Sequence, residues 1–285
     1  MNGWNRANDY VSNGRAVRIL RRILKSNRKR LHSGTKYRFG VAIPRNTKQA
    51  YLFDEQNGNT LWADAIKEEM DKILAFETFE FLPAGTKPDN HQRIPLHMCF
   101  AVKWDGRHKA RLVAGGHHTL PGDTDAYANV VSNESVRIGM FLATLNNLDV
   151  LVGDVGNAYL HANTNEKVYS VAGPEFGEHQ GKTIRIVKSL YGLRTSHIRW
   201  RNFLNNDLRA MNFTPSKVDA DLWYRDAGDH YEYIAVYVDD IMVFSRRAAA
   251  IMEEIQEKYK MKGVGKPEIY LGGNIGYHDP PESST

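Results

Sequence analysis

The stretch Ile234-Ala-Val-Tyr-Val-Asp-Asp-Ile-Met-Val-Phe244 places two adjacent carboxylates inside an otherwise apolar run that is rich in β-branched residues. Such a run predicts extended strands on both sides of the acidic pair. Because burying an unpaired carboxylate is costly, Asp239 and Asp240 must lie at an exposed turn or be neutralised by cations. A plain hairpin turn is one interpretation, but the flanking residues Val238 and Ile241 are not the Gly or Asn that such turns usually contain.

A third carboxylate in an apolar setting is Asp154, in the stretch Leu148-Asp-Val-Leu-Val-Gly-Asp-Val-Gly-Asn-Ala-Tyr-Leu160. If this strand lies beside the first stretch, Asp154, Asp239 and Asp240 form an oxygen-only cluster. Such a cluster suits hard divalent cations, and Mg²⁺ binds through a few carboxylates together with substrate phosphates. A pair of such ions can activate an attacking hydroxyl and stabilise a leaving pyrophosphate, which indicates nucleotidyl transfer.

The rest of the chain alternates irregularly between helical and extended patterns. Helices are expected over 60–74, with Thr60 as N-cap, and over 135–148, 191–211 and 248–259. Strands are expected over 98–104, 109–114, the start of 150–160, 183–188, 231–245 and 268–275. The first two of these strands flank Asp105-Gly106 and read as a β-hairpin. This order predicts an α+β fold with a mostly antiparallel sheet.

The charge distribution divides the chain into two parts. Residues 1–50 contain thirteen basic residues and one acid, whereas the remaining 235 residues contain 25 basic and 32 acidic residues. The basic segment reads either as a solvated linker or as an arm that touches nucleic acid through its phosphates. Cys99 is the only cysteine, which excludes a disulfide scaffold and fits a reducing compartment. No signal peptide or membrane-spanning run is expected, so the predicted location is intracellular rather than secreted.

The sequence also resembles a known family. Tyr237-Val-Asp-Asp240 is similar to the YxDD signature of reverse transcriptases, and five further blocks resemble the copia-type retrotransposon branch. These blocks are Lys109-Ala-Arg-Leu-Val-Ala-Gly-Gly116, Val130-Val-Ser-Asn-Glu-Ser-Val-Arg137, Asp154-Val-Gly-Asn-Ala-Tyr-Leu160, Ser189-Leu-Tyr-Gly-Leu193 and Tyr270-Leu-Gly-Gly-Asn-Ile275. They follow the family's order across residues 37–276.

The resemblance implies a fold and a domain organisation. The fold would be α+β, with the fingers and palm of a right-hand polymerase, a mostly antiparallel sheet, and a short or absent thumb. A basic extension or linker would occupy 1–36, the reverse transcriptase domain 37–276, and a disordered tail 277–285.

The resemblance also implies an activity. The chain would be the RNA-directed DNA polymerase domain of a copia-type retrotransposon polyprotein, a nucleotidyltransferase that extends a primer 3′-hydroxyl. The alternative is a truncated, catalytically inactive retroelement remnant that at most binds nucleic acid. The altered block at 194–198 and the early end at Thr285 favour the remnant, while the three intact acids favour the enzyme.

The cofactors and partners follow from the same resemblance. Two Mg²⁺ ions are expected, with Mn²⁺ as a substitute. The partners would be an RNA or DNA template with its primer, deoxynucleoside triphosphates and other domains of the polyprotein, but no membrane. The location would be the cytoplasm, a virus-like particle or the nucleus.

Individual residues match functional positions of the family. Asp154, Asp239 and Asp240 match the catalytic acids. Asp154, Asp239 and the backbone of Val155 match the metal contacts, although Val155 could equally be a core residue.

The residues that match nucleotide-binding positions are Lys103, Lys109, Arg111 and Tyr159. The three basic side chains could reach the triphosphate, or they could be ordinary exposed charges on strands. Tyr159 would lie under the incoming sugar and exclude a 2′-hydroxyl, or it could be an ordinary buried aromatic. The residues that match primer or template contacts are Tyr237, Gly272 and Gly273, since glycine permits close backbone approach.

Overall fold

The computed structural model describes residues 34–119, 129–270 and 273–276. Nearly all of the predicted basic extension 1–36, the predicted tail 277–285 and Gly272 lie outside these residues. The described chain forms two compact units, of which the first comprises 34–65 and 99–110 and the second 66–98 and 111 onward. No helix among the described residues is both long and apolar enough to cross a membrane.

The first unit contains a short β-hairpin, one complete helix and the first part of a second helix. Its elements are β1 (Lys36–Arg38), β2 (Val41–Ile43), α2 (Thr47–Asn57) and the N-terminal part of α3 (Leu61–Ala75). Asp54 joins the two helices, because its carboxylate accepts hydrogen bonds from the N–H groups of Trp62 and Ala63. Helix N-termini have unsatisfied N–H groups of this kind, so the start of α3 is capped from the preceding helix. Thr60, the predicted N-cap, directly precedes α3; its carbonyl accepts a hydrogen bond from the N–H of Asp64 at 2.8 Å, and its hydroxyl donates to the Asp64 carboxylate.

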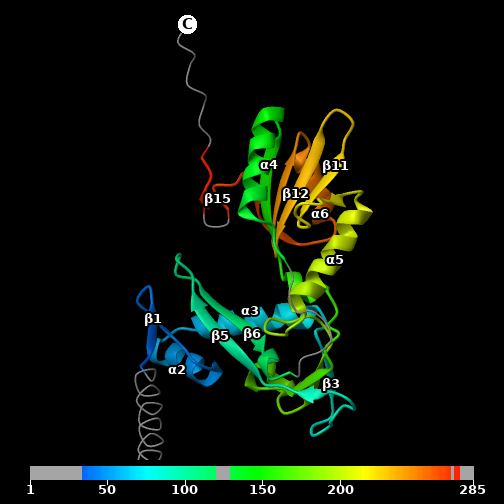
Figure 1. Cartoon of the computed structure of the whole chain (residues 1–285). Coiled ribbons are helices and arrows are strands. Elements are labelled where there is room, and N and C mark those ends of the chain that lie inside the picture. The colour runs from blue at the N-terminus through cyan, green and yellow to red at the C-terminus, as the bar shows by residue number, and fades with distance from the viewer. Residues whose placement is uncertain (1–33, 120–128, 271–272, 277–285) are drawn as a thin grey trace, which may run out of the picture. The chain divides into compact units, whose positions relative to one another are not determined.

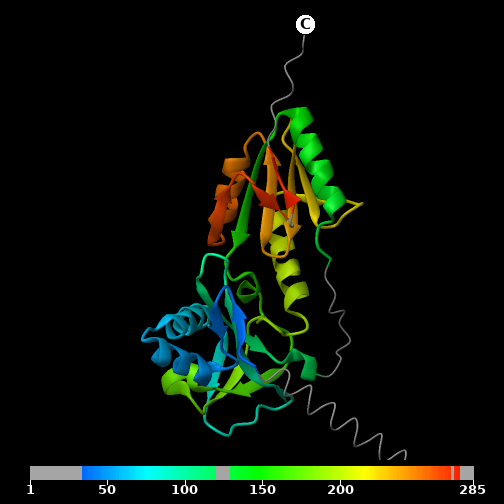
Figure 2. The same ribbon diagram turned by 90° about the vertical axis from the view of Figure 1, so that its left-hand side faces the viewer.

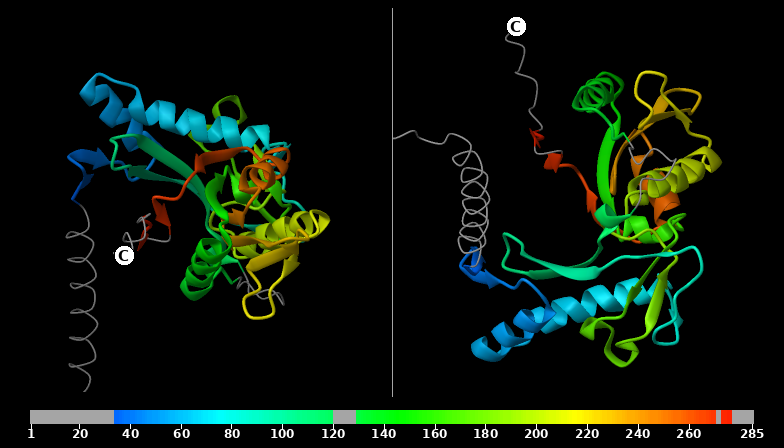
Figure 3. Two further views of the ribbon diagram at one scale, coloured as in Figure 1. Left: turned by 90° about the horizontal axis from the view of Figure 1, so that it is seen from above. Right: turned by 60° about the horizontal axis from the view of Figure 1, so that its bottom comes forward.

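The predicted hairpin around Asp105-Gly106 is confirmed. It consists of β5 (Leu96–Val102) and β6 (His108–Ala114), which form a separate two-stranded sheet and are visible as long paired strands in the right-hand view of Figure 3. Alternate residues are buried, among them Ala110, Leu112 and Ala114 of β6.

The second unit is built around a six-stranded antiparallel sheet. Its strand order is β10-β11-β12-β13-β7-β14. The strands are β7 (Asp149–Val155), β10 (Thr214–Pro215), β11 (Leu222–Asp226), β12 (Tyr231–Tyr237), β13 (Asp240–Ser245) and β14 (Met261–Gly265). The two segments with the predicted acids, β7 and β12–β13, are therefore neighbours in one sheet.

Helices cover both faces of this sheet. The side chains of α5 (Ser196–Ala210) and α6 (Ala248–Gln256) pack on one face against Ile234, Ile241 and Val243. The helix α4 (Asn133–Asn146) packs on the other face against Ala235, Met242 and Phe244. Figures 1 and 2 show α4 standing apart from α5 and α6 across the strands. This alternation of odd and even residues is the two-residue period of a strand with both faces buried.

The second unit also contains a four-stranded sheet of order β3-β9-β8-β4, in which only β4 and β8 run parallel. Its strands are β3 (Phe79–Leu82), β4 (Gln92–Arg93), β8 (Val168–Val171) and β9 (Thr183–Ile186). The short 3-10 helices are η1 (Gly116–His118), η2 (Ala158–His161) and η3 (Pro174–His179). The predicted α+β class with a mostly antiparallel sheet is confirmed.

Several local expectations differ from the structure. The helix expected from 191 begins only at Ser196. The closing strand expected over 268–275 is a pair of two-residue strands, β15 (Ile269–Tyr270) and β16 (Gly273–Asn274). The strand β14 has no counterpart among the predicted elements, because Met261-Lys-Gly-Val-Gly265 has two glycines and no apolar alternation.

Candidate active site

The β12–β13 connection is a two-residue turn that presents the acidic pair. Tyr237 pairs with Asp240, so Val238 and Asp239 alone form the loop. Val238 has a φ of 59°, in the left-handed region that β-branched residues rarely adopt. Backbone strain of this kind persists only where the surroundings impose it, and it concentrates at functional sites.

The sheet register brings the predicted acids together. Asp240 of β13 is directly opposite Asp154 of β7, and opposite residues in an antiparallel pair project from the same face. The N–H of Val155 donates a hydrogen bond of 2.7 Å to the carbonyl oxygen of Asp239, which ties the turn to β7. The three carboxylates therefore belong to one cluster at the end of two strands.

Electrostatics indicate the same proximity. Burial, followed by the negative charges of Asp239 and Asp154, raises the pKa of Asp240 from its ordinary value of 3.8 to about 6. Like charges held close together disfavour full ionisation, and a cation would relieve this repulsion. Oxygen-only donors in such a cluster fit a hard divalent ion. No set of three His, Cys, Asp or Glu side chains in the described parts of the chain is arranged to enclose an ion.

The edge strand β14 adds a basic residue that the sequence reasoning missed. Lys262 is opposite Asp154 on the side away from Asp240, so Asp240, Asp154 and Lys262 form a row across three strands. The N–H of Gly156 also donates to the carbonyl of Lys260, at 2.9 Å. No pattern in the 261–265 segment could have revealed this pairing, because it depends on register between distant strands.

An aromatic and cationic group adjoins the acids. Tyr159 of η2 makes an edge contact with Tyr191, with ring centroids 5.0 Å apart, and the Arg111 guanidinium lies 5.1 Å from the centre of the Tyr191 ring. Burial raises the pKa of Tyr191 to about 12, and the charge of Asp239 adds to the rise. The pKa of Tyr159 is raised by burial and by Asp239 as well. The structure thus brings the predicted Arg111 and Tyr159 near the acids.

Tyr191 was not predicted as a site residue, although its block was part of the resemblance. Backbone contacts explain why this block contains a glycine. The N–H of Ala114 donates to the Tyr191 carbonyl at 2.7 Å, and the N–H of Gly116 donates to the Gly192 carbonyl at 3.2 Å. A Cβ on Gly192 would lie 2.1 Å from the Ala114 oxygen, and Gly192 has a φ of 90°. Only glycine fits there, so the glycines of the two blocks allow β6 to meet the loop before α5.

The remaining predicted residues lie in different places. Lys103 and Lys109 belong to the first unit, and their predicted role is not tested by the geometry of the second. Val155 is fully buried, Tyr237 is exposed at the end of β12, and Gly273 lies in β16 opposite Tyr270.

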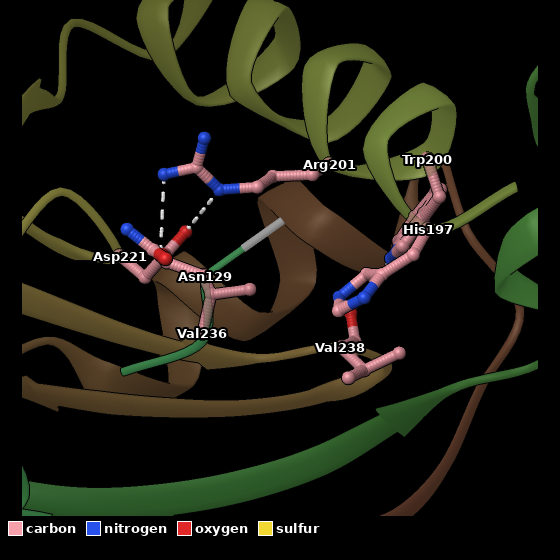
Figure 4. Close-up of a pocket in the computed structure, with 7 residues that line it drawn as sticks. All are labelled: Asn129, His197, Trp200, Arg201, Asp221, Val236 and Val238. Atoms are coloured by element: carbon pink, nitrogen blue, oxygen red, sulfur yellow. Dashed lines mark hydrogen bonds and ion pairs between the residues drawn. The ribbon is translucent and has the colours of Figure 1, made fainter. Parts of the chain in front are cut away.

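A small cavity lies behind the turn, between α5 and the strands (Figure 4). Arg201 and Asp221 close one side of it with two hydrogen bonds, of 2.7 and 3.1 Å. His197 and Trp200 of α5 face Val238 of the turn on the other side. Burial lowers the pKa of His197, which favours a neutral imidazole. The volume of about 10 Å³ has room for about one water molecule.

Comparisons with known proteins agree on one family. The family model described as "Reverse transcriptase (RNA-dependent DNA polymerase)" matches residues 77–279. The "Retrovirus-related Pol polyprotein from transposon RE1" of Arabidopsis thaliana is 28% identical over 255 residues, covering 83% of this chain and 17% of that protein. The corresponding polyprotein from transposon TNT 1-94 of Nicotiana tabacum is 27% identical over 248 residues, covering 81% and 18%.

A solved structure described as "foamy viral protease-reverse transcriptase dRH in complex with ds DNA" covers 70% of this chain and 30% of that chain, with 17% identity and a TM-score of 0.40. The chain spans less than a fifth of the length of the polyproteins that it matches. The family match covers most of the chain and includes all three predicted acids, so this chain belongs to the reverse transcriptase (RNA-dependent DNA polymerase) family, in its copia-type branch.

Proposed function

We propose that the chain is the RNA-directed DNA polymerase domain of a copia-type retrotransposon polyprotein, which extends a primer 3′-hydroxyl with deoxynucleoside triphosphates. The observation that supports this most is the cluster of Asp154, Asp239 and Asp240 at the end of β7 and the β12–β13 turn. Mutually repelling carboxylates destabilise the fold, and proteins retain such a cost mainly at functional sites.

Reverse transcriptases generally use divalent metal ions, and the donors of this cluster fit Mg²⁺. Asp154, Asp239 and the backbone carbonyl of Val155 would hold two such ions, with Mn²⁺ as a substitute, and Asp240 would support the site. When bound, the ions would supply charge neutralisation and a lowered pKa of the primer hydroxyl. The paired strands β7 and β13 would hold the carboxylates in fixed positions, because side chains on regular strands are placed more precisely than side chains on loops.

The group beside the acids has the chemistry of a nucleotide subsite. Arg111 presents a forked donor suited to phosphate oxygens, and its guanidinium lies over the ring of Tyr191. Tyr159 is half-buried beside that ring and near Asp239, which supports its proposed contact with the incoming sugar. Lys103 and Lys109 on the β5–β6 hairpin are proposed as further phosphate contacts, and Tyr237, Gly272 and Gly273 as primer contacts.

The proposed partners are a primed RNA or DNA template and other domains of the polyprotein, and the proposed location is inside the cell. A chain that binds a primed template but never extends it would instead be the inactive remnant.

Primer extension on a homopolymer RNA template with Mg²⁺ tests the proposal. We expect extension by the parent chain. Combining Asp239→Asn and Asp240→Asn should lower the extension rate at least about 100-fold, because both carboxylates would lie at the ions that contact the reacting phosphates. Asp149→Asn is the matched control, since Asp149 is exposed at the opposite end of β7. Extension that survives the double substitution would disprove the assignment of the acids. A parent inactive with both Mg²⁺ and Mn²⁺ would favour the remnant.

A further inference from the structure

A buried indole is hydrogen-bonded to the turn that presents Asp239. Nε1 of Trp200 donates to the carbonyl oxygen of Val238 at 2.6 Å. Trp200 is only 1% exposed and lies on the first half of α5. Figure 4 shows Trp200 and His197 extending from α5 toward Val238. A short, shielded hydrogen bond of this kind is stronger than an exposed one.

The two carbonyls of the loop are held from two directions. The carbonyl of Asp239 accepts from Val155 of β7, and the carbonyl of Val238 accepts from Trp200 of α5. Val238 has to keep a φ of 59°, which a β-branched residue resists. Both hydrogen bonds favour this strained conformation, and so they fix the direction in which the Asp239 side chain leaves the turn.

The indole itself is held in place by aromatic neighbours. Tyr259 contacts the Trp200 ring edge-on with centroids 5.5 Å apart, Phe203 stacks at 6.4 Å, and His161 lies at 5.9 Å. His161 is the last residue of η2, which follows β7, and its Nε2 is 3.3 Å from the Gly156 carbonyl oxygen. The donor of the hydrogen bond is therefore positioned by a rigid cluster that also contacts the segment after β7.

We infer that Trp200 is a positioning residue, whose indole N–H holds the Val238–Asp239 turn in its strained conformation so that Asp239 is directed toward the divalent ions. This inference rests on the proposed function, because it concerns the same carboxylates. It assigns to Trp200 a role that packing alone would not require.

The chain contains a matched control. Trp223 of β11 is fully buried in the same apolar cluster, but its Nε1 has no hydrogen-bond partner among the described residues. Both Trp200→Phe and Trp223→Phe replace an indole by a smaller phenyl ring, but only Trp200→Phe also removes a hydrogen bond. The difference between the two variants isolates the N–H group.

The first readout is Mn²⁺ binding by electron paramagnetic resonance, without substrate. We expect Trp200→Phe to weaken binding about 5- to 10-fold, and Trp223→Phe to change it less than about twofold, because only the first loses a hydrogen bond. In primer extension, Trp200→Phe should lower kcat about tenfold and leave the KM for nucleotide within about twofold, since the turn carries the acid rather than the nucleotide contacts. Equal effects of the two substitutions on both readouts would overturn the inference.

Rescue distinguishes positioning from packing. Glycine adopts positive φ without strain, so Val238→Gly should make the turn independent of the indole. We expect Trp200→Phe to cost less than about threefold in Mn²⁺ affinity in the Val238→Gly background. An equally large loss in both backgrounds would show that Trp200 does not act on the strained turn.

A measurement on the parent chain covers the case in which Trp200→Phe does not fold. With ¹⁵N-labelled tryptophan, Mg²⁺ should shift the Trp200 indole N–H signal and leave that of Trp223 in place. Binding of Mg²⁺ with neither signal moving would overturn the inference alone. A parent that binds neither Mg²⁺ nor Mn²⁺ would overturn the proposed function, and the positioning role with it.

Discussion

Replacing one of the three acids should make the chain more stable. Asp240→Asn removes a charge that burial and the neighbours Asp239 and Asp154 oppose. The pKa of Asp240 is about 6 in the folded chain against an ordinary value of 3.8, and one pKa unit corresponds to about 1.36 kcal/mol. The full difference of about 3 kcal/mol is an upper bound, because water reaches part of this site and screens the charges. We expect a gain of about 2 kcal/mol in the free energy of unfolding near neutral pH.

The pH dependence has a definite sign. Since the folded pKa is raised, ionisation of Asp240 costs stability as the pH rises from about 4 to about 6, and the full cost remains above that range. The advantage of Asp240→Asn should therefore be small near pH 4 and complete near pH 7. Mg²⁺ should reduce the advantage, because bound cations offset the repulsion in the parent.

Denaturant unfolding in EDTA, at about pH 4.5 and about pH 7.5, measures this difference. Asp149→Asn serves as the control on the same strand, and it should lie within about 0.5 kcal/mol of the parent. If Asp240→Asn is no more stable than Asp149→Asn at the higher pH, or if its advantage does not fall at the lower pH, the three carboxylates do not repel one another as the structure implies.

Three other perturbations separate the parts of the site. Arg111→Ala should raise the KM for deoxynucleoside triphosphates about 10-fold by removing a charged phosphate donor, and steady-state kinetics with Arg111→Lys as the intermediate case checks this. Tyr159→Ala should admit ribonucleotides into the product, and unchanged sugar discrimination in an active variant would contradict its proposed contact with the sugar. Gly192→Ala should cost at least about 3 kcal/mol, because a Cβ meets the Ala114 oxygen and φ is positive. Gly228→Ala, also at positive φ but with nothing near its Cβ, should cost only about 1 kcal/mol, and thermal unfolding of the pair separates the steric contribution.

Sequence patterns predicted most of the elements that surround the acids. The alternation of apolar residues around Asp239 and Asp240 predicts two strands, and the helical period predicts the existence of α4, α5 and α6, although α5 begins five residues later than expected. These signals are local, since each arises from side chains that face one side of one element. The end of α4 could not be read from the sequence, because the helix expected over 135–148 ends at Asn146. Leu148 is buried, whereas Leu145 is 63% exposed.

The sequence by itself determined the fold class and the family, and it singled out Asp154, Asp239 and Asp240 as acids in apolar surroundings. Residue types and their order along the chain are enough for these conclusions. Only the tertiary structure decided the register that sets Asp154 between Asp240 and Lys262. It also decided the contact of Arg111 with Tyr191 and the hydrogen bond from Trp200 to Val238. Each of these joins segments that are tens of residues apart, and such pairings depend on how whole strands and helices pack, which no local period encodes.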